Sequence, residues 1–491
     1  ALIITLTTIL ASAAQEPVNR NASKEAREVL SYLSSIYGKK SLLGYNVYPH
    51  TPDIYEQTGR HGALWGRDLE WPGDMNEVAR NALDYRYILT FHWHWGFDGE
   101  SAWKSGRVHQ VNVGAMVTPG TAEYKAAMRE LSICADKLQV LMDAGVPVLF
   151  RPLHEIDGGW FWWTDLTKPE NTAALWRMIY DYFTNVRHLN NLIWVYSAGM
   201  GVNSDVNYRA RFYPGAAFVD IAGIDLYGID YRNAIGAYKT NFELMTKVAP
   251  GKMLGLAEAD ACPDPDKMAA GIIPAWLYCM PWWGTPNPAH PVDWALRETG
   301  HDFMLTLDKL PYLGTGAIKP SVGITRPFDD GSGRFNDNIP VIQAYALSRG
   351  SRIAHVDFLA NGVTVGSRSV APYTFTWNNA PPGLYSMQAR AVDVTGAAML
   401  SNTVHIASGV AALAFKQPVV TSSGTGGQSA VDGNFYTSWI SDVNHPTPDD
   451  QWIYVDLGRV FTINQVHSVW GLKIHPSDYT IDVATEQPNS A

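Results

Sequence analysis

Eight short apolar segments recur between residues 41 and 284, and they constrain the fold more than any other feature of the sequence. Several of them are separated by amphipathic stretches with the period of a helix, such as residues 121–145 and 171–189. Strands that alternate with helices predict parallel βα units. Eight such units predict a closed (β/α)8 barrel, the TIM barrel of the α/β class. The eight segments are residues 41–47, 62–71, 87–95, 146–155, 192–198, 219–228, 252–260 and 275–284.

The chain of 491 residues is long enough for about two to four domains. We assign residues 18–316 to the barrel. Beyond it, short alternating segments broken by "NG", "PPG" and "TG" predict a β-sandwich at residues 317–408. Residues 409–491 are again β-rich but shorter than a typical domain, so we expect a partial second sandwich there.

The first 17 residues contain an apolar run that ends in small residues, among them Ala11-Ser12-Ala13. Such a run is typical of a secretion signal cut at a small-residue site, and it is too short to span a bilayer. We therefore expect residues 1–17 to be the remnant of a signal peptide and the protein to be secreted.

Net charge and aromatic content narrow the class of partner. A formal charge of −10 without a basic stripe argues against nucleic acid and anionic membranes. The 18 tryptophans and 24 tyrosines indicate either large cores or stacking surfaces for sugars. The three cysteines are too few for a disulfide framework and lack metal-type spacing, so we expect buried thiols, with one bridge as the alternative.

Polar side chains end most of the apolar segments, and the carboxyl ends of barrel strands meet at one mouth. Glu155 ends the fourth segment and Glu258 the seventh, so the two carboxylates are predicted to share a cavity. Paired carboxylates are the apparatus of glycoside hydrolysis, and a separation of about 5–5.5 Å gives retention of configuration. The alternative for Glu155 is a structural ion pair with Arg151.

The environments of the two glutamates predict different roles. Aromatic neighbours would bury Glu155, raise its pKa and suit it to be the acid. Glu258 would stay ionised if Tyr227 or an arginine donates to it. Trp160 and Trp163 are predicted to contact sugar rings, with core packing as the alternative for part of this aromatic run.

The segment "RPLHEIDGGWFWW" (151–163) resembles the acid/base signature of glycoside hydrolase family 26, to which many β-mannanases belong. The resemblance covers residues 24–310 and implies that Glu155 is the proton donor and Glu258 the nucleophile. It also implies that Tyr227 hydrogen-bonds the nucleophile. The family commonly has Met-Asn where this chain has Ile156-Asp157, which leaves the role of Asp157 open.

The same resemblance implies further substrate-binding residues. His154 belongs to the His-Glu pair of the signature, and His94 in "TFHWHWGF" lines the subsite next to the cut bond. Trp282 or Trp283 lies beneath the sugar of that subsite.

The resemblance implies a secreted, retaining endo-β-1,4-mannanase that acts on β-mannan or a related plant polysaccharide. We expect a monomer with no metal and no cofactor. The alternatives are a relative acting on mixed-linkage β-glucan or β-1,3-xylan, or a non-catalytic glycan-binding protein. His92 and His94 also allow a metal-dependent hydrolase, although later strands lack the further ligands it needs.

Two resemblances concern the tail. Residues 340–408 resemble a bacterial Ig-like sandwich. The segment "AVDGNFYTSWIS…DDQWIYVDLG" is similar to the first half of a discoidin-type (coagulation factor type C) carbohydrate-binding domain. These resemblances imply a spacer followed by a partial glycan-binding module.

Overall fold

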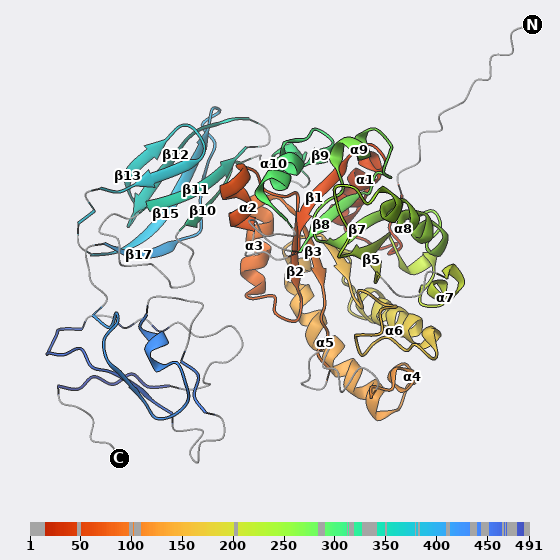
Figure 1. Cartoon of the computed structure of the whole chain (residues 1–491), viewed down its shortest axis with the longest axis horizontal. Helices are drawn as coiled ribbons and strands as arrows, with labels where there is room; N and C mark the ends of the chain where they lie inside the picture. Colours follow the sequence, from red (N-terminus) through yellow and green to blue (C-terminus); the bar gives the residue numbers. More distant parts are fainter. Residues whose placement is uncertain are drawn as a thin grey trace, which may run out of the picture. The chain divides into compact units, whose positions relative to one another are not determined.

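The computed structural model divides the chain into two compact units, Ala1–Ile318 and Lys319–Ala491, which we describe separately (Figure 1). It describes residues 15–46, 51–97, 102, 110–200, 205–282, 290–311, 313, 319–326, 341–348, 351–378, 380–381, 383–408, 413–432, 439–442, 451–463, 466, 468 and 479–485. Most of the expected signal sequence therefore lies outside the described residues. Among the helices described, none is long and apolar enough to cross a membrane.

The first unit contains a closed parallel barrel, as the sequence predicts. Each strand pairs with the next in the chain, and β1 pairs with both β2 and β8, which closes the sheet. A short strand, β9 (Met304–Leu305), adds to β1. The barrel strands are β1 (Ser41–Tyr45), β2 (Leu64–Asp68), β3 (Ile88–His92), β4 (Val148–Arg151), β5 (Leu192–Ala198), β6 (Ile221–Leu226), β7 (Met253–Ala259) and β8 (Tyr278–Pro281).

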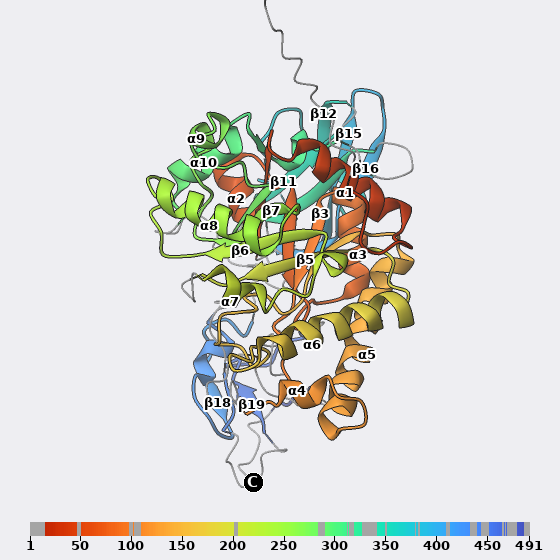
Figure 2. The ribbon, with the colours of Figure 1, turned by 90° about the vertical axis from the view of Figure 1, so that its right-hand side faces the viewer.

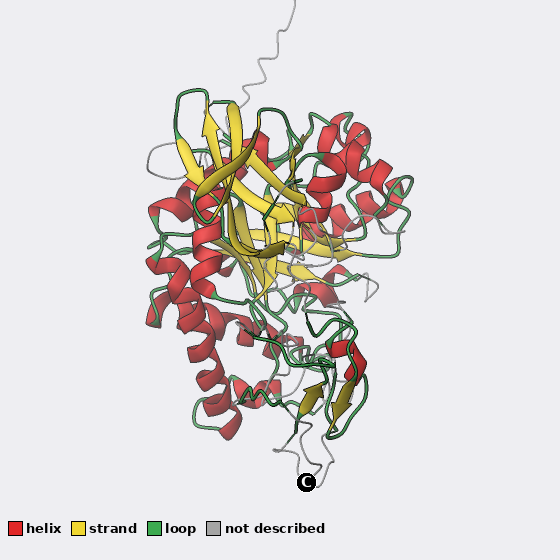
Figure 3. Cartoon of the chain, turned by 90° about the vertical axis from the view of Figure 1, so that its left-hand side faces the viewer, coloured by secondary structure: helices red, strands yellow, loops and turns green. Residues whose placement is uncertain are grey.

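Helices cover the outside of these strands (Figures 2 and 3). Local sequence explains where several begin, because Ser23, Asp74 and Thr121 each accept a backbone N–H of the first turn. The helices are α1 (Lys24–Ile36), α2 (Thr51–Thr58), α3 (Met75–Tyr85), α4 (Val113–Met116), α5 (Ala122–Asp143), α6 (Pro169–Asp181), α7 (Val206–Ala210), α8 (Ile235–Val248), α9 (Pro265–Ala269) and α10 (Val292–Gly300). A π-helical turn, Tyr182–Val186, continues α6.

The fourth strand is shorter than predicted. The sequence predicts a strand that reaches Glu155, but β4 ends at Arg151. Pro152 follows and has no N–H for the sheet, and Leu153 and Glu155 both have φ of +49°. The chain therefore turns before Glu155, which lies on a loop above the strand and not on the strand itself.

The register of the barrel sets several polar side chains level with one another. Asp68 on β2 pairs with His92 on β3, and His92 pairs with Arg151 on β4. On the other side, Asp225 on β6 pairs with Glu258 on β7. All five residues lie at or near the carboxyl ends of their strands, so the predicted polar mouth is present.

A bulge in β7 precedes Glu258. Ile224 pairs with Leu256 and the next residue, Asp225, pairs with Glu258, so Ala257 is an extra residue on β7. A bulge changes the direction in which the following side chains point. Here it brings Glu258 opposite Asp225.

The predicted thiols are confirmed. Cys134, Cys262 and Cys279 are all free and buried.

The second unit contains the predicted β-sandwich strands. One sheet has the order β10 (Ser321–Arg326), β11 (Val341–Leu347), β14 (Tyr373–Thr376). The other contains β12 (Ile353–Ala360), β13 (Val363–Arg368), β15 (Gly383–Asp393), β16 (Ala398–Leu400) and β17 (Val404–Ser408). Phe358 and Phe375 stack with ring centroids 5.3 Å apart within the apolar cluster between the strands.

The predicted "NG" hairpin is also present. Asn361 and Gly362 have φ of +50° and +80° between β12 and β13, as a two-residue type I′ turn requires. Farther along the chain, β18 (Val419–Thr421) pairs with β19 (Ile453–Val455) in antiparallel orientation.

We expect Gly44→Ala to destabilise the barrel at its closure. A Cβ at Gly44 would overlap the Sδ of Met280 and would lie 2.6 Å from the Cβ and 2.9 Å from the carbonyl oxygen of Leu64. Overpacking of this kind costs about 1–3 kcal/mol. The midpoint of thermal unfolding, followed by circular dichroism, should therefore fall.

The matched control is Gly236→Ala in the first turn of α8, where a Cβ meets nothing within 4 Å. This variant should unfold at the wild-type temperature or slightly above it, because alanine favours a helix more than glycine does. Equal midpoints for the two variants would contradict tight packing at Gly44.

Candidate active site

Glu258 is held at the end of β7 by two donors. The guanidinium of Arg151 donates to its Oε1, and the hydroxyl of Tyr227 donates to its Oε2 at 2.6 Å. Arg151 also bonds Asp225, with its Nη1 3.0 Å from Oδ2. Ser197 completes the network by donating to Oδ1 of Asp225 at 2.8 Å. Both donors to Glu258 that the sequence allowed are therefore present.

This network keeps Glu258 ionised. Burial alone would raise its pKa, but the charge of Arg151, the nearby His92 and the hydrogen bond from Tyr227 bring the pKa below its ordinary value. For Asp225, burial outweighs the charge of Arg151, so the pKa of Asp225 is raised well above its usual range. Burial, together with the charge of Glu258, also raises the pKa of Tyr227, so this side chain keeps the proton that it donates.

Glu155 faces Glu258 across the mouth. One carboxylate oxygen of Glu155 and one each of Asp225 and Glu258 all lie within 4.8 Å of one another. Burial, then the charge of Glu258, raises the pKa of Glu155 to about 7. The proposed structural ion pair of Glu155 with Arg151 is not formed, since the bonds of Arg151 go to Ser197, Asp225 and Glu258.

The Gly-Gly pair that follows Glu155 makes room for Trp160. The indole N–H of Trp160 donates to Oε2 of Glu155 at 2.5 Å. A Cβ at Gly158 would overlap the indole, and one at Gly199 would lie 2.9 Å from it. Gly159 has a φ of +83°, a conformation that glycine adopts at no steric cost. Trp160 remains 38% exposed, so it can also present a ring to a ligand.

Asp157, whose role the sequence left open, is fully buried. Its Oδ1 accepts the backbone N–H of Gly199 at 2.8 Å, and its Oδ2 lies 3.1 Å from Nε of Arg209. Asp157 therefore ties the loop that carries Glu155 to the end of β5 and to α7.

The third-strand histidines lie next to Trp282. The rings of His92 and Trp282 have centroids 5.1 Å apart, and His94 meets Trp282 edge-on at 6.2 Å. His154 contacts both histidines, at 5.4 and 4.4 Å between centroids. The predicted residues His94, His154 and Trp282 are therefore brought together. Trp283 lies outside the described residues.

Trp163 is a correction to the predicted sugar contacts. Its side chain has no exposed surface, stacks on Phe161 at 4.3 Å and donates its N–H to the carbonyl oxygen of His154 at 3.2 Å. Trp162 is also buried and donates to the carbonyl oxygen of Trp95 at 2.6 Å. These two rings form the core beneath the site, and Trp160 is the exposed member of the run.

Within the part of the chain that the structure describes, two groups of acidic and histidine side chains have the spacing of metal ligands. One is Asp68, His92 and His94, and the other is Glu155, Asp225 and Glu258. In the second group, Arg151 already supplies the compensating positive charge. The first group is linked by hydrogen bonds of its own, with Nδ1 of His94 2.6 Å from Oδ2 of Asp68.

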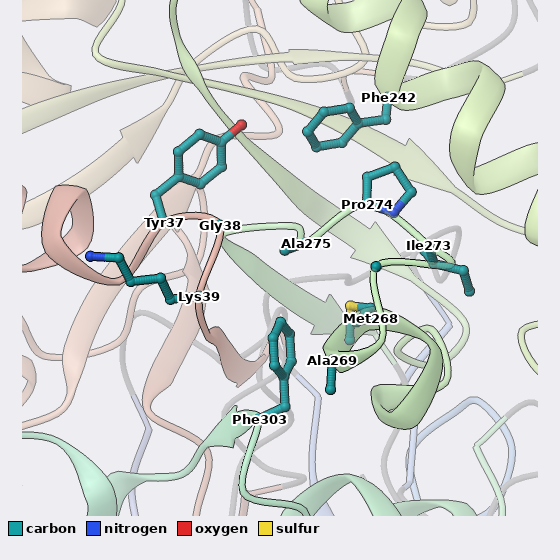
Figure 4. A pocket seen from close by; sticks show the side chains of 11 residues that line it. Tyr37, Gly38, Lys39, Phe242, Met268, Ala269, Ile273, Pro274, Ala275 and Phe303 are labelled. Carbon is teal, nitrogen blue, oxygen red and sulfur yellow. The ribbon is translucent and has the colours of Figure 1, made fainter. Parts of the chain in front are cut away.

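A separate cavity of about 640 Å³ lies at the opposite end of the barrel (Figure 4). Tyr37 and Lys39 precede β1, Ile273 precedes β8 and Phe303 precedes β9, so the lining comes from the amino ends of strands. Figure 4 shows the rings of Tyr37 and Phe303 on different sides of this cavity. It is not the site of the paired glutamates, which lie at the carboxyl ends.

The profile of glycosyl hydrolase family 26 matches residues 18–308, more than half of the chain. The chain belongs to glycosyl hydrolase family 26. A bacterial Ig domain profile matches residues 320–405. Both resemblances are therefore confirmed, whereas no comparison supports the discoidin-type domain.

Curated and solved relatives agree with this family. A mannan endo-1,4-β-mannosidase of Thermothelomyces thermophilus is 30% identical over 322 residues, which cover 60% of this chain and 62% of that protein. The chain thus spans about three fifths of this relative's length.

Among solved structures, a β-mannanase from a symbiotic protist of the termite Reticulitermes speratus, complexed with gluco-manno-oligosaccharide, is 28% identical. That match has a TM-score of 0.54 and covers 60% of this chain and 97% of that one. The GH26-CBM35 β-(1,4)-mannanase of Podospora anserina is 30% identical, with a TM-score of 0.52 and coverage of 60% and 68%.

The sequence did not identify the hydrogen-bond network around this family 26 site. Arg151 was predicted only as a possible partner of Glu155, and Asp225 and Ser197 were not predicted as its partners. One signal was available, because a charged residue directly after the apolar run "VLF" needs a buried partner. The identity of that partner depends on the register of β6 and β7.

We expect Glu155 to titrate near pH 7. The carboxyl carbon of a 13C-labelled glutamate, followed by NMR, should give a midpoint of about 7, because burial and Glu258 both oppose its ionisation. In Glu258→Gln the midpoint should fall but stay above the ordinary value of 4.5, since burial is the larger cause.

Glu170→Gln is the control, because Glu170 is exposed and pairs with Arg211 away from this site. It should leave the Glu155 midpoint unchanged. A midpoint near 4.5 in the wild type would contradict the described burial of Glu155.

Proposed function

We propose that the protein is a retaining endo-β-1,4-mannanase. The observation that carries the proposal is a pair of carboxyl groups within 4.8 Å of each other that differ in ionisation. Near neutral pH, Glu155 still holds a proton in a substantial part of the molecules, while Glu258 is ionised. This short separation fits double displacement and leaves too little room for the water molecule that inverting enzymes place between their carboxylates.

In the first step, the carboxylate of Glu258 attacks the anomeric carbon while Glu155 gives its proton to the glycosidic oxygen. The bond between the anomeric carbon and that oxygen breaks, and the leaving sugar departs with the proton. Arg151 and Tyr227 hold both oxygens of Glu258, so the nucleophile is oriented before substrate arrives. The product of this step is a sugar ester of Glu258.

The second step uses the same two residues in reversed roles. Once Glu258 is esterified, its negative charge no longer raises the pKa of Glu155, so Glu155 stays ionised after giving up its proton and is available as the base. Glu155 takes a proton from a water molecule, and the resulting hydroxide attacks the anomeric carbon and breaks the ester. Both glutamates return to their starting states.

The substrate assignment is supported by the relatives named above. They are mannanases, and each aligns with 60% of this chain. Trp282, His94 and His154 form an aromatic and polar wall next to the glutamates, and we propose that they contact the sugar beside the cut bond. Trp160 is proposed as a further contact. Trp283 is proposed with them on the resemblance alone.

The remaining assignments concern the rest of the chain. We propose residues 1–17 as an export signal, 18–316 as the catalytic domain of a secreted monomer, and 317–408 as an Ig-like spacer. We also propose that 409–491 belongs to a discoidin-type glycan-binding module, which the all-β sequence and the pair β18–β19 support. Retention of residues 319–491 on insoluble mannan in a pull-down would test this module.

Replacing each glutamate by alanine should give different azide products from an aryl β-mannobioside with a good leaving group. In Glu258→Ala, azide attacks the anomeric carbon once from the opposite face, so the product is the α-glycosyl azide. In Glu155→Ala, azide replaces water in the second step, so the product is the β-glycosyl azide. The anomers are distinguished by NMR.

Without azide, Glu258→Ala should lose about 10⁴-fold or more of kcat on mannan. Glu155→Ala should lose about 10²–10⁴-fold. Glu170→Ala on the surface is the control and should keep the wild-type rate. Wild-type activity in Glu258→Ala, or the same azide anomer from both variants, would contradict the assigned roles.

A substrate screen distinguishes the remaining alternatives. We expect release of manno-oligosaccharides from galactomannan at a rate well above any release from lichenan or β-1,3-xylan, measured by chromatography of the products. A preference for lichenan or xylan would favour the family alternatives, and binding without hydrolysis would favour a non-catalytic glycan-binding protein. Loss of hydrolysis in the presence of a chelator would favour a metal-dependent hydrolase.

A further inference from the structure

The carboxylate of Asp68 contacts His92 and His94, and His94 in turn contacts His154 beside the paired glutamates. Its Oδ1 accepts the backbone N–H of Glu70 at 3.0 Å and that of His94 at 3.1 Å. Its Oδ2 lies 2.6 Å from Nδ1 of His94 and 3.6 Å from Nε2 of His92. Each oxygen of Asp68 therefore has a defined set of partners.

Asp68 must act as an acceptor. Burial opposes its ionisation, but His92 and His94 hold the pKa of Asp68 well below its ordinary value. An ionised carboxylate only accepts hydrogen bonds. The hydrogen of the short bond between Asp68 and His94 therefore lies on Nδ1 of His94.

The contact between His94 and His154 determines which ring nitrogen of His154 carries the hydrogen. Nε2 of His94 lies 3.1 Å from Nε2 of His154, and two nitrogens at this distance share one hydrogen. When His94 carries a single hydrogen, that hydrogen lies on Nδ1, and His154 then donates from Nε2. Nδ1 of His154 is then a lone pair, and it is buried without a hydrogen-bond partner among the residues that the structure describes.

The surroundings keep His154 neutral. Burial is the main cause that holds the pKa of His154 well below its ordinary value, and the nearby charge of Arg151 acts in the same direction. Aromatic contacts fix the ring, with Phe161 4.9 Å and Trp163 5.5 Å away between centroids. A neutral ring at the residue before Glu155 adds no positive charge that would pull the proton off the acid.

We propose that Asp68 is a positioning residue that directs the hydrogen bonds from His154 through His94, so that both rings keep a fixed orientation and a defined tautomer beside the sugar site. The proposal rests on the proposed function, because the sugar site is that of the mannanase. Asp68 itself is proposed to act only through His94 and His154. We call this chain of three side chains the Asp68 relay.

Asp68→Asn tests the relay with no change in size. Oδ1 of residue 68 must still accept two backbone N–H groups, so the new amide nitrogen would face Nδ1 of His94 and donate to it. His94 would then carry its hydrogen on Nε2, and His154 on Nδ1. Two-bond 1H–15N NMR spectra of the imidazoles should show both tautomers reversed relative to the wild type.

Activity gives the second measurement. A reversed relay leaves the N–H of His154 without an acceptor next to Glu155, and we expect kcat on mannan to fall by about 10²-fold or more. The matched control is Asp74→Asn at the exposed N-cap of α3, where asparagine caps as well as aspartate. It should change neither the tautomers nor kcat.

A double variant separates the relay from a packing role. In a His154→Phe background, Asp68→Asn should cost much less than in the wild type, because the relay no longer reaches the site. Unchanged tautomers in Asp68→Asn, a doubly protonated His94 in the wild type, or fully additive losses would overturn the proposal. A protein inactive on mannan that still shows the assigned tautomers would overturn the proposed function and leave the relay intact.

Discussion

The buried guanidinium of Arg151 is the interaction on which the rest of the site depends. It lies between two carboxylates, Asp225 and Glu258, that the register of β6 and β7 sets side by side. Arg151 supplies a cation on a rigid strand, which lowers the pKa of Glu258, whereas burial still keeps the pKa of Asp225 well above its usual range. Its fork of donors also fixes the orientation of Glu258. Without Arg151, Glu258 would lose the largest of the causes that lower its pKa and one of its two hydrogen-bond donors.

The opposite ionisation of Glu155 follows from the same arrangement. Arg151 makes no bond to Glu155, so this carboxyl group is buried near a negative charge without a direct ion pair. Its pKa is therefore tied to the state of Glu258. When Glu258 is charged, it raises the pKa of Glu155, and Glu155 retains its proton. When Glu258 is neutralised as an ester, the pKa of Glu155 falls and the proton is lost more readily. One acid can thus serve first as proton donor and then as base.

Much of this architecture could be predicted from the sequence, because it depends on local patterns. The eight apolar segments each contain a barrel strand, and "NG" at 361–362 forms the expected hairpin. Glu155 and Glu258 were identified because a buried carboxylate is costly and because the ends of their two strands meet at one mouth. The separation and burial of the two groups required the fold.

The errors and omissions have a common cause, which is that they depend on contacts between distant segments. Trp160 and Trp163 look equivalent in the sequence, yet the turn at Gly158-Gly159 brings one to the surface and leaves the other in the core. Pro152 and the positive φ of Leu153 end β4 before Glu155, although the apolar pattern continues. The partners of Arg151 could not be predicted because they lie on β5, β6 and β7.

The extra residue in β7 has a consequence for how this barrel can vary. Every residue of β7 is buried, so its apolar composition alone does not specify which side chains face the mouth. The bulge lets β7 carry this extra residue while Glu258 stays level with Asp225. A regular strand of the same seven residues would place Ala257 opposite Asp225 and turn the side chain of Glu258 to the other face of the sheet. Removal of the bulge with every residue kept would therefore move the nucleophile from the mouth to the helix side of the barrel.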